Sequence, residues 1–101
     1  MVEIYNKKIL LKKITHIEFT TRTENCLRND NIFYIGDLVQ KTENEMLRIP
    51  NLGKNSFNEI KEILKPMNLT LGMKLKDWTE QNIEKWIKEL YHYPYLIDDF
   101  W

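Results

Sequence analysis

Residues 50–56 read P-N-L-G-K-N-S and form a turn between two segments with apolar residues at helical spacing, Glu43–Ile49 and Phe57–Leu64. A short turn with a glycine between two helices predicts a helix-hairpin-helix unit, whose second helix begins at Gly53. The backbone N–H groups at that helix start would point outward together and attract phosphate oxygens. The turn therefore predicts a phosphate-binding site, and nucleic acid is the first partner that it suggests.

Helix signals continue on both sides of this turn. Two T-x-x-E motifs, Thr21–Glu24 and Thr42–Glu45, have the spacing of capping boxes, so a helix should follow each. The first of these helices should end near Asn29, and Gly36–Gln40 is expected to form another short helix. A last helix through Leu90 would be capped by Asp77 or Thr79.

No segment has a convincing strand pattern, so the predicted fold class is all-α, a compact bundle of about five short helices with helix-hairpin-helix character. Three parts are expected along the chain. Residues 1–16 would form an N-terminal lead with a short irregular helix, and residues 17–78 the helix-hairpin-helix domain. Residues 79–101 would add a C-terminal helix and an aromatic tail, which packs on the domain or on a partner.

Composition narrows the range of partners. The chain has 101 residues with 15 basic and 15 acidic side chains, which argues against a strongly basic, non-specific nucleic-acid binder.

A single cysteine excludes an internal disulfide and fits a reducing compartment. Neither a signal peptide nor a membrane span is recognisable, so a cytoplasmic protein is expected. The opening Met1-Val2-Glu3 favours a free-standing chain over an excised domain.

The first helix after the lead carries polar groups suited to DNA. Arg22, Asn25 and Arg28 follow at three-residue steps and are expected to share one helix face. Arginine can enter a narrow minor groove over A·T-rich sequence, and asparagine can bond to base edges there. The alternative interpretation is an ordinary solvated polar face.

Four stretches now combine into a family resemblance: Thr20–Arg28 (T-T-R-T-E-N-C-L-R), Ile32–Gln40 (I-F-Y-I-G-D-L-V-Q), Pro50–Ile60 (P-N-L-G-K-N-S-F-N-E-I) and Leu69–Met73 (L-T-L-G-M). In this order they resemble the C-terminal domain of the bacterial RNA polymerase α subunit, over most of the chain from Leu10 to Asn82. The resemblance implies a compact helical fold that binds A·T-rich promoter-upstream DNA through the minor groove. It also implies contacts with activators and sigma factor, and a cytoplasmic location at the nucleoid.

Carried over by position, the resemblance implies a DNA surface drawn from two helices: Arg22, Asn25, Cys26, Gly53, Asn55, Ser56 and Glu59. Arg22 would reach into the groove, while Gly53 and Ser56 would hold backbone phosphates. Glu59 has two open interpretations, as a group that orients a neighbouring cation or as the capping-box partner of Ser56. Lys54 and Arg28 would add positive charge to this surface.

Two departures from the family pattern weaken its expected contacts. Asn55 stands where the family commonly has a lysine, so about one phosphate contact is lost. His16 stands where the family often has an acid on its sigma-facing surface, although Glu18 is kept. The resemblance also implies a second protein-contact surface, used for activators, on Thr42, Glu43, Asn44 and Glu45. An ordinary capped helix explains these four residues individually.

The rival hypothesis is a protein-interaction module that keeps the fold but binds polymerase, sigma factor, an activator or a second copy of itself. Its motivation is the neutral charge and the aromatic C-terminus, through whose tail a homodimer could form. Trp78 and Trp86 fall at helical spacing and are expected in the protein's own core. A repair-type helix-hairpin-helix module is a third alternative.

Catalysis is not expected. His16 and His92 are far apart in sequence, and Cys26 has no base beside it, so neither a zinc site nor a nucleophile is indicated. The chain also lacks a G-x-x-x-x-G-K-[ST] loop. We therefore expect neither a metal nor a cofactor.

Overall fold

The computed structural model describes residues 8–92, and in this part of the chain the regular structure is helical. A first helical turn at residues 8–10 is followed by η1 (Ile14–His16), α2 (Thr21–Asn29), α3 (Ile35–Val39), α4 (Glu43–Leu47), α5 (Gly53–Leu64), η2 (Lys65–Met67) and α6 (Glu80–Tyr91). The only β pairing within residues 8–92 is an isolated antiparallel bridge between Lys13 and Tyr34. The predicted all-α fold class is confirmed.

Threonine side chains start three of the helices. Thr20, Thr42 and Thr79 are the N-caps of α2, α4 and α6, and each side chain accepts a hydrogen bond from the backbone N–H three residues later. At α4 the predicted capping box is complete, because Glu45 accepts from the Thr42 N–H at 3.0 Å. Each cap satisfies one of the N–H groups that a helix start leaves without an intrahelical partner.

The capping box predicted over Thr21–Glu24 is wrong. The helix begins one residue earlier than that motif requires, so the cap is Thr20 and the third helical residue is Thr23. Thr23 has no carboxylate with which to reach back to the cap. The carboxylate that bonds to the Thr20 cap comes from another helix and is described with the candidate site.

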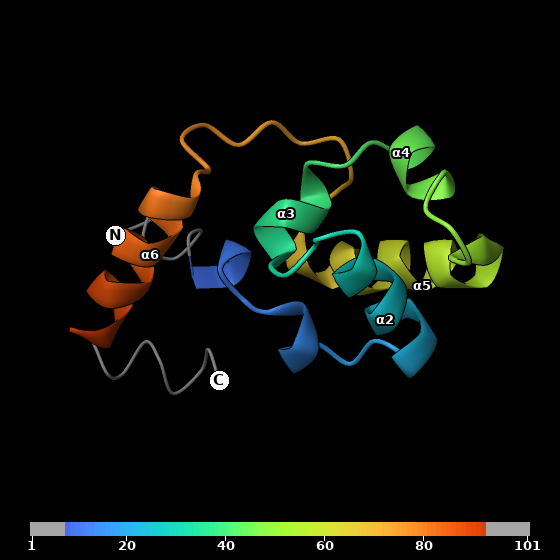
Figure 1. Ribbon diagram of the computed structural model, residues 1–101, viewed down its shortest axis with the longest axis horizontal. Helices are drawn as coiled ribbons and strands as arrows, with labels where there is room; N and C mark the ends of the chain where they lie inside the picture. The colour runs from blue at the N-terminus through green and yellow to red at the C-terminus, as the bar shows by residue number, and fades with distance from the viewer. Residues whose placement is uncertain (1–7, 93–101) are drawn as a thin grey trace.

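One apolar core lies among α2, α3, α4 and α5, which form the body of the molecule (Figure 1). Its side chains with 0% exposure include Leu27, Leu38, Met46 and Ile60. Burying side chains of this size stabilises the fold by roughly 1.5–3 kcal/mol each. The connector after η2 is tied to this body, because the Met73 N–H donates to the Val39 carbonyl at 2.8 Å.

Helix α6 lies at one end of the body and builds a second, smaller apolar cluster with Leu11 (Figure 1). Trp78 joins the two parts. Its indole lies against Trp86 with ring centroids 6.0 Å apart, and its Nε1 donates to the Asp37 carboxylate at 2.8 Å. The expected packing of Trp78 and Trp86 within the protein is confirmed. The expectation for the aromatic tail, residues 93–101, lies outside the described residues.

None of the helices between residues 8 and 92 is long and apolar enough to cross a bilayer.

Candidate nucleic-acid interface

The turn before α5 is built from two residues with left-handed backbone conformations. Asn51 has φ 66° and Gly53 has φ 74°, and Leu52 between them is only 2% exposed. Leu52 therefore anchors the turn in the core, while the two left-handed residues reverse the chain around it. Asparagine and glycine are the residues that tolerate this conformation most readily. The predicted start of the second hairpin helix at Gly53 is confirmed.

The N-terminus of α5 has no side-chain cap, unlike those of α2, α4 and α6. Its N-cap is Leu52, so the N–H groups of Gly53, Lys54 and Asn55 have no acceptor within the helix. All three residues are exposed. Together with the positive end of the helix dipole, this arrangement favours an anion.

Ser56 differs from its three predecessors. As the fourth residue of α5 it is the first whose N–H can bond to the carbonyl of the N-cap, and its side chain is only 5% exposed. The Ser56 amide therefore does not join the three open amides of the turn, and the expected phosphate contact by the Ser56 hydroxyl stays a prediction. Its covered position comes from the same periodicity that buries Ile60 and Leu64 on the inner face of α5.

Arg22 reaches from α2 to this turn. Its Nε and Nη2 atoms lie 3.3 Å and 3.2 Å from the carbonyl oxygen of Asn51. A Cβ atom at Gly53 would stand 3.7 Å from Arg22 Nη2, so the guanidinium passes directly beside the glycine. A guanidinium retains further N–H donors when two point to one carbonyl. Arg22 can therefore be held in place and still bond to a ligand.

Glu59 links the starts of the two helices. Its carboxylate accepts from the Thr20 N–H at 2.7 Å, from the Thr20 hydroxyl at 2.9 Å and from the Thr23 hydroxyl at 2.7 Å. Partial burial raises the pKa of Glu59, but these hydrogen bonds together outweigh it and hold the pKa below the ordinary value.

Of the two sequence-based interpretations of Glu59, the capping box with Ser56 is wrong, whereas an indirect influence on a neighbouring cation stays a prediction. Ser56 is not the cap of α5, so it cannot form a capping box with Glu59. The oxygens of Glu59 are occupied by threonine donors rather than by a cation. The carboxylate instead supplies to α2 the second half of a capping box that Thr23 cannot provide.

A shallow depression of about 380 Å³ lies between the two helix starts. Six of the nine residues expected at a DNA surface line it, together with Thr20 and Leu52: Arg22, Gly53, Lys54, Asn55, Ser56 and Glu59. Arg22 and Lys54 bring two positive charges, and the one carboxylate is already bonded to α2. Both helices begin on the side of the body away from α6 (Figure 1).

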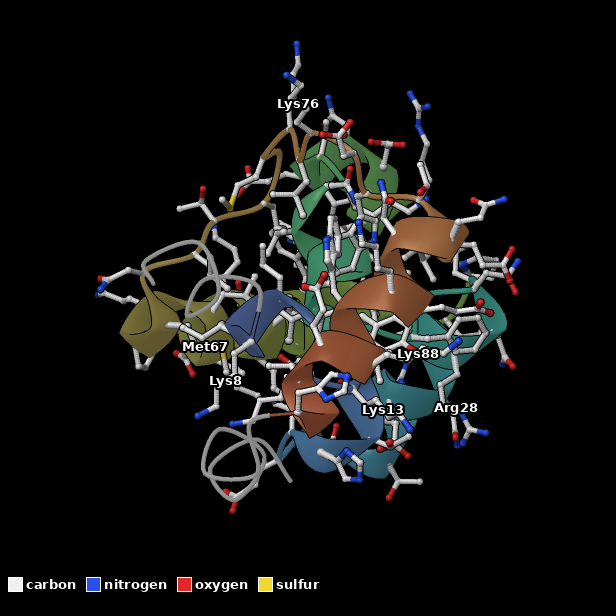
Figure 2. All side chains as sticks on the ribbon, turned by 90° about the vertical axis from the view of Figure 1, so that its left-hand side faces the viewer. Lys8, Lys13, Arg28, Met67, Lys76 and Lys88 are labelled. Carbon is white, nitrogen blue, oxygen red and sulfur yellow. The ribbon has the colours of Figure 1, made fainter. Side chains whose placement is uncertain are left out.

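Three expected residues do not line this depression. Asn25 is exposed one turn further along α2, whereas Cys26 is 8% exposed and belongs to the core. The Cys26 side chain thus packs in the core, and a DNA contact by this residue stays a prediction. Arg28 lines a different groove with Trp78 and Ile83, at the end of the molecule that carries α6 (Figure 2).

The helix geometry explains the position of Arg28. Each three-residue step falls about 60° short of a full turn, so Arg28 is rotated by about 120° from Arg22 and lies about 9 Å further along the axis. The expectation that Arg22, Asn25 and Arg28 share one face holds for neighbouring pairs only. Arg28 and Arg22 are therefore separated on the surface.

The residues expected at protein contacts are exposed: Glu18, Thr42, Glu43, Asn44 and Glu45. Thr42 and Glu45 are bonded to each other in the cap of α4, which lowers the pKa of Glu45. Glu43 forms an ion pair of 2.9 Å with Lys61. Leu47, at the end of the same helix, is 55% exposed and adds an apolar group to this surface.

Asn51 and Thr20 are site residues that sequence reasoning missed. The Asn51 carbonyl holds Arg22, and Thr20 bonds to Glu59. The sequence holds a signal for Asn51, because an asparagine between a proline and a glycine suggests a left-handed turn residue. No local signal connects Thr20 to a residue 39 positions away.

Within residues 8–92, no group of three His, Cys, Asp or Glu side chains is arranged to hold a metal ion.

Comparison with known proteins supports the same fold. Residues 3–66 match the family of the C-terminal domain of the bacterial RNA polymerase alpha chain. The NMR structure of the C-terminal domain of the RNA polymerase alpha subunit from Helicobacter pylori matches with a TM-score of 0.60 and 32% sequence identity. That match extends over 84% of this protein and 72% of the other.

Proposed function

Because this protein belongs to the family formed by the C-terminal domains of bacterial RNA polymerase α subunits, we propose that it binds A·T-rich duplex DNA through the minor groove, using the depression between α2 and α5. Family membership makes it a non-catalytic transcription module that associates with RNA polymerase. The resemblance found in the sequence is thereby confirmed. Binding at promoter-upstream DNA would place it at the nucleoid in the cytoplasm.

The observation that carries this proposal is the position of Arg22 beside the uncapped start of α5. Its guanidinium lies 3.2 Å from the Asn51 carbonyl oxygen and borders Gly53, whose N–H begins the helix. A duplex presents phosphates on both sides of a narrow minor groove. A group that enters the groove therefore needs a phosphate-binding site next to it, and these two features lie next to each other here.

The open start of α5 and the polar side chains of α2 have separate roles in this proposal. The amides of Gly53, Lys54 and Asn55 bind a backbone phosphate, and the Lys54 ammonium adds charge. Arg22 enters the A·T-rich minor groove and is attracted by its strong negative potential, while Asn25 lies at the edge of the groove. The affinity is modest, because few cations face the DNA and the protein has no net charge.

Fluorescence anisotropy with A·T-rich and G·C-rich duplexes of equal length tests the proposal. We expect tighter binding to the A·T-rich duplex, and Arg22→Ala should weaken it by about 10-fold or more, as for other specific contacts. Arg48→Ala, which removes an exposed arginine from the end of α4, is the matched control and should change little. Equal binding to both duplexes, or full binding by Arg22→Ala, would contradict the proposal.

A protein-contact role is the second candidate, and the exposed Leu47 favours it. Leu47 is 55% exposed beside the polar surface of α4, a combination suited to an activator or sigma factor. Capture of purified polymerase or sigma factor should then depend on Leu47, with Leu47→Ser lowering it and Arg22→Ala leaving it intact. Mass measurement across a range of concentrations tests the expected homodimer. A monomer that captures neither protein would exclude this role.

A further inference from the structure

Glu59 makes a contact that its position in the sequence does not suggest. It lies on the second turn of α5, yet all three of its hydrogen bonds run to the start of α2, to residues 36 and 39 positions away. These bonds of 2.7–2.9 Å involve a charged acceptor, which makes them stronger than neutral hydrogen bonds. Together with the Arg22–Asn51 contact, they form the polar link between the two helix starts that flank the depression.

We propose that Glu59 is a positioning residue, whose carboxylate holds the first turn of α2 against α5 and so keeps Arg22 over the turn without itself touching DNA. This inference rests on the proposed function, since Arg22 is the group that it positions for the groove. In this role Glu59 affects DNA binding indirectly, through the position of the Arg22 side chain.

The order of residues in α2 supports this role. Thr20 is the cap, Thr21 the first helical residue and Arg22 the second, so Arg22 stands in the turn that Glu59 closes. Helix ends fray when their caps are lost. Without the carboxylate, the first turn of α2 would open and Arg22 would lose its fixed distance to Asn51.

The hydroxyl of Thr23 gives a second reason to regard Glu59 as a positioning residue. It is 0% exposed, and its hydroxyl donates to Glu59 at 2.7 Å. A buried hydroxyl without an acceptor is costly, so the contact favours one arrangement of the two helices. Glu59 therefore restricts the position of α2 as well as satisfying its cap.

The carboxylate also occupies a site that would attract a phosphate. The start of α2 carries the positive end of a helix dipole, and the charge of Glu59 satisfies it from within the protein. The start of α5 has no such internal anion. Of these two helix starts, α5 is thus the one left open to DNA.

A double-mutant cycle with Arg22 tests the inference. Glu59→Gln keeps the shape of the side chain and removes its charge, and we expect it to weaken binding to an A·T-rich duplex about 10-fold, the size expected when a charged hydrogen bond is lost. In the Arg22→Ala background the same change should weaken binding less than about 2-fold, because a residue that acts through Arg22 has nothing left to position. Measurement at low salt keeps the weaker variants in range.

Glu62→Gln is the matched control, since Glu62 is an exposed carboxylate on the same helix outside the depression. It should leave affinity within about 2-fold of the parent or raise it slightly by removing a negative charge. If Glu59→Gln tightens binding as Glu62→Gln does, or weakens it equally with and without Arg22, the inference is overturned.

A DNA-free measurement separates this inference from the proposed function. In the parent, the Arg22 Nε–H bonds to Asn51, so its NMR signal should be protected from exchange with solvent. Glu59→Gln should speed that exchange at least about 5-fold, as expected for opening of a local turn, while the signals of the core amides stay in place. Unchanged exchange would refute the positioning role even if the protein binds A·T-rich DNA.

Thr23→Val provides a second variant if Glu59→Gln proves unstable. It removes one of the three donors, keeps a side chain of similar size and leaves the Glu59 charge in place. Faster Arg22 Nε–H exchange in Thr23→Val, with Thr23→Ser restoring the parent value, would support the inference. Parent-like exchange in Thr23→Val would count against it.

Discussion

The guanidinium of Arg22 lies 3.2 Å from the backbone carbonyl oxygen of Asn51, so the turn that opens α5 also holds an arginine from α2. The left-handed backbone of Asn51, with φ 66°, belongs to the same reversal of the chain that exposes the start of α5. One turn thus positions two groups that come from different helices. A side chain held in advance loses less conformational freedom on binding, which improves affinity without any new contact.

This contact predicts that a lysine cannot take over the role of Arg22, so that Arg22→Lys impairs DNA recognition. A lysine ammonium is a single point of charge on a flexible stem, so it cannot direct two donors to one carbonyl and still present others to a ligand. We expect about a 10-fold loss of preference for A·T-rich over G·C-rich duplexes, of the size that one specific contact contributes. Anisotropy titrations with both duplexes measure it, and a lysine variant with the parent preference would contradict the prediction.

Gly53→Ala should impair both stability and binding. Gly53 has φ 74°, where an L side chain is strained, and a Cβ there would stand 3.7 Å from Arg22 Nη2. We expect a loss of about 1–2 kcal/mol in the free energy of unfolding, measured with urea, and weaker DNA binding. Gly72→Ala is the control, because Gly72 has φ 83° with nothing within 4 Å of a Cβ. It should lose similar stability and keep DNA binding.

Much of the fold could be predicted because its signals are local. The threonine caps at Thr42 and Thr79, the start of α5 at Gly53 and the end of its α-helical part before Pro66 all depend on residues within a few positions of one another. The capping box predicted at Thr21 failed because the cap is Thr20, and the carboxylate that completes this cap, Glu59, comes from another helix. A periodic pattern cannot reveal such a distant partner.

The candidate site was predicted in outline and not in its division of roles. Arg22 and the turn were found from sequence, whereas burial of Cys26 and Ser56 depends on which face of each helix meets the core. Arg28 was grouped with Arg22 although two three-residue steps already rotate it away. The helical positions of these residues were correct, and their exposure required the packed structure.

Gly36→Ala should loosen α6 from the body. A Cβ at Gly36 would overlap the Trp78 ring, whose indole N–H donates to Asp37 at 2.8 Å. Displacing the ring should cost about 1–3 kcal/mol, the usual range for overpacking. Urea unfolding measures this loss, and the Trp78 indole N–H signal in NMR should shift toward that of a solvent-exposed indole. An unchanged indole signal would show that Trp78 does not depend on Gly36.

The lowered pKa of Glu59 predicts a specific loss of stability in acid. Partial burial opposes the shift, but the bonds from Thr20 and Thr23 outweigh it, so the folded protein holds the charged form more tightly than the unfolded chain does. The resulting stability is present above the ordinary glutamate pKa, about 4.3, and is lost as the pH falls through the lower folded value.

The free energy of unfolding, measured with urea, should therefore fall more between pH 7 and pH 3 for the parent than for Glu59→Gln. The variant has no charge to lose at this position. Glu45 also has a lowered pKa and is present in both proteins, so it contributes equally to each fall. Equal falls in the two proteins would mean that the carboxylate of Glu59 is not stabilised by its threonine donors.

Asn55→Lys should strengthen DNA binding. Asn55 is exposed in the uncapped first turn of α5, beside Lys54 and within the depression. A lysine there adds about one phosphate contact, so the slope of log affinity against log salt should steepen by about 0.9. Asn58→Lys is the control, because it adds the same charge to an exposed position of α5 outside the depression. If both lysines steepen the slope equally, the gain comes from net charge, and the first turn of α5 is not where phosphate binds.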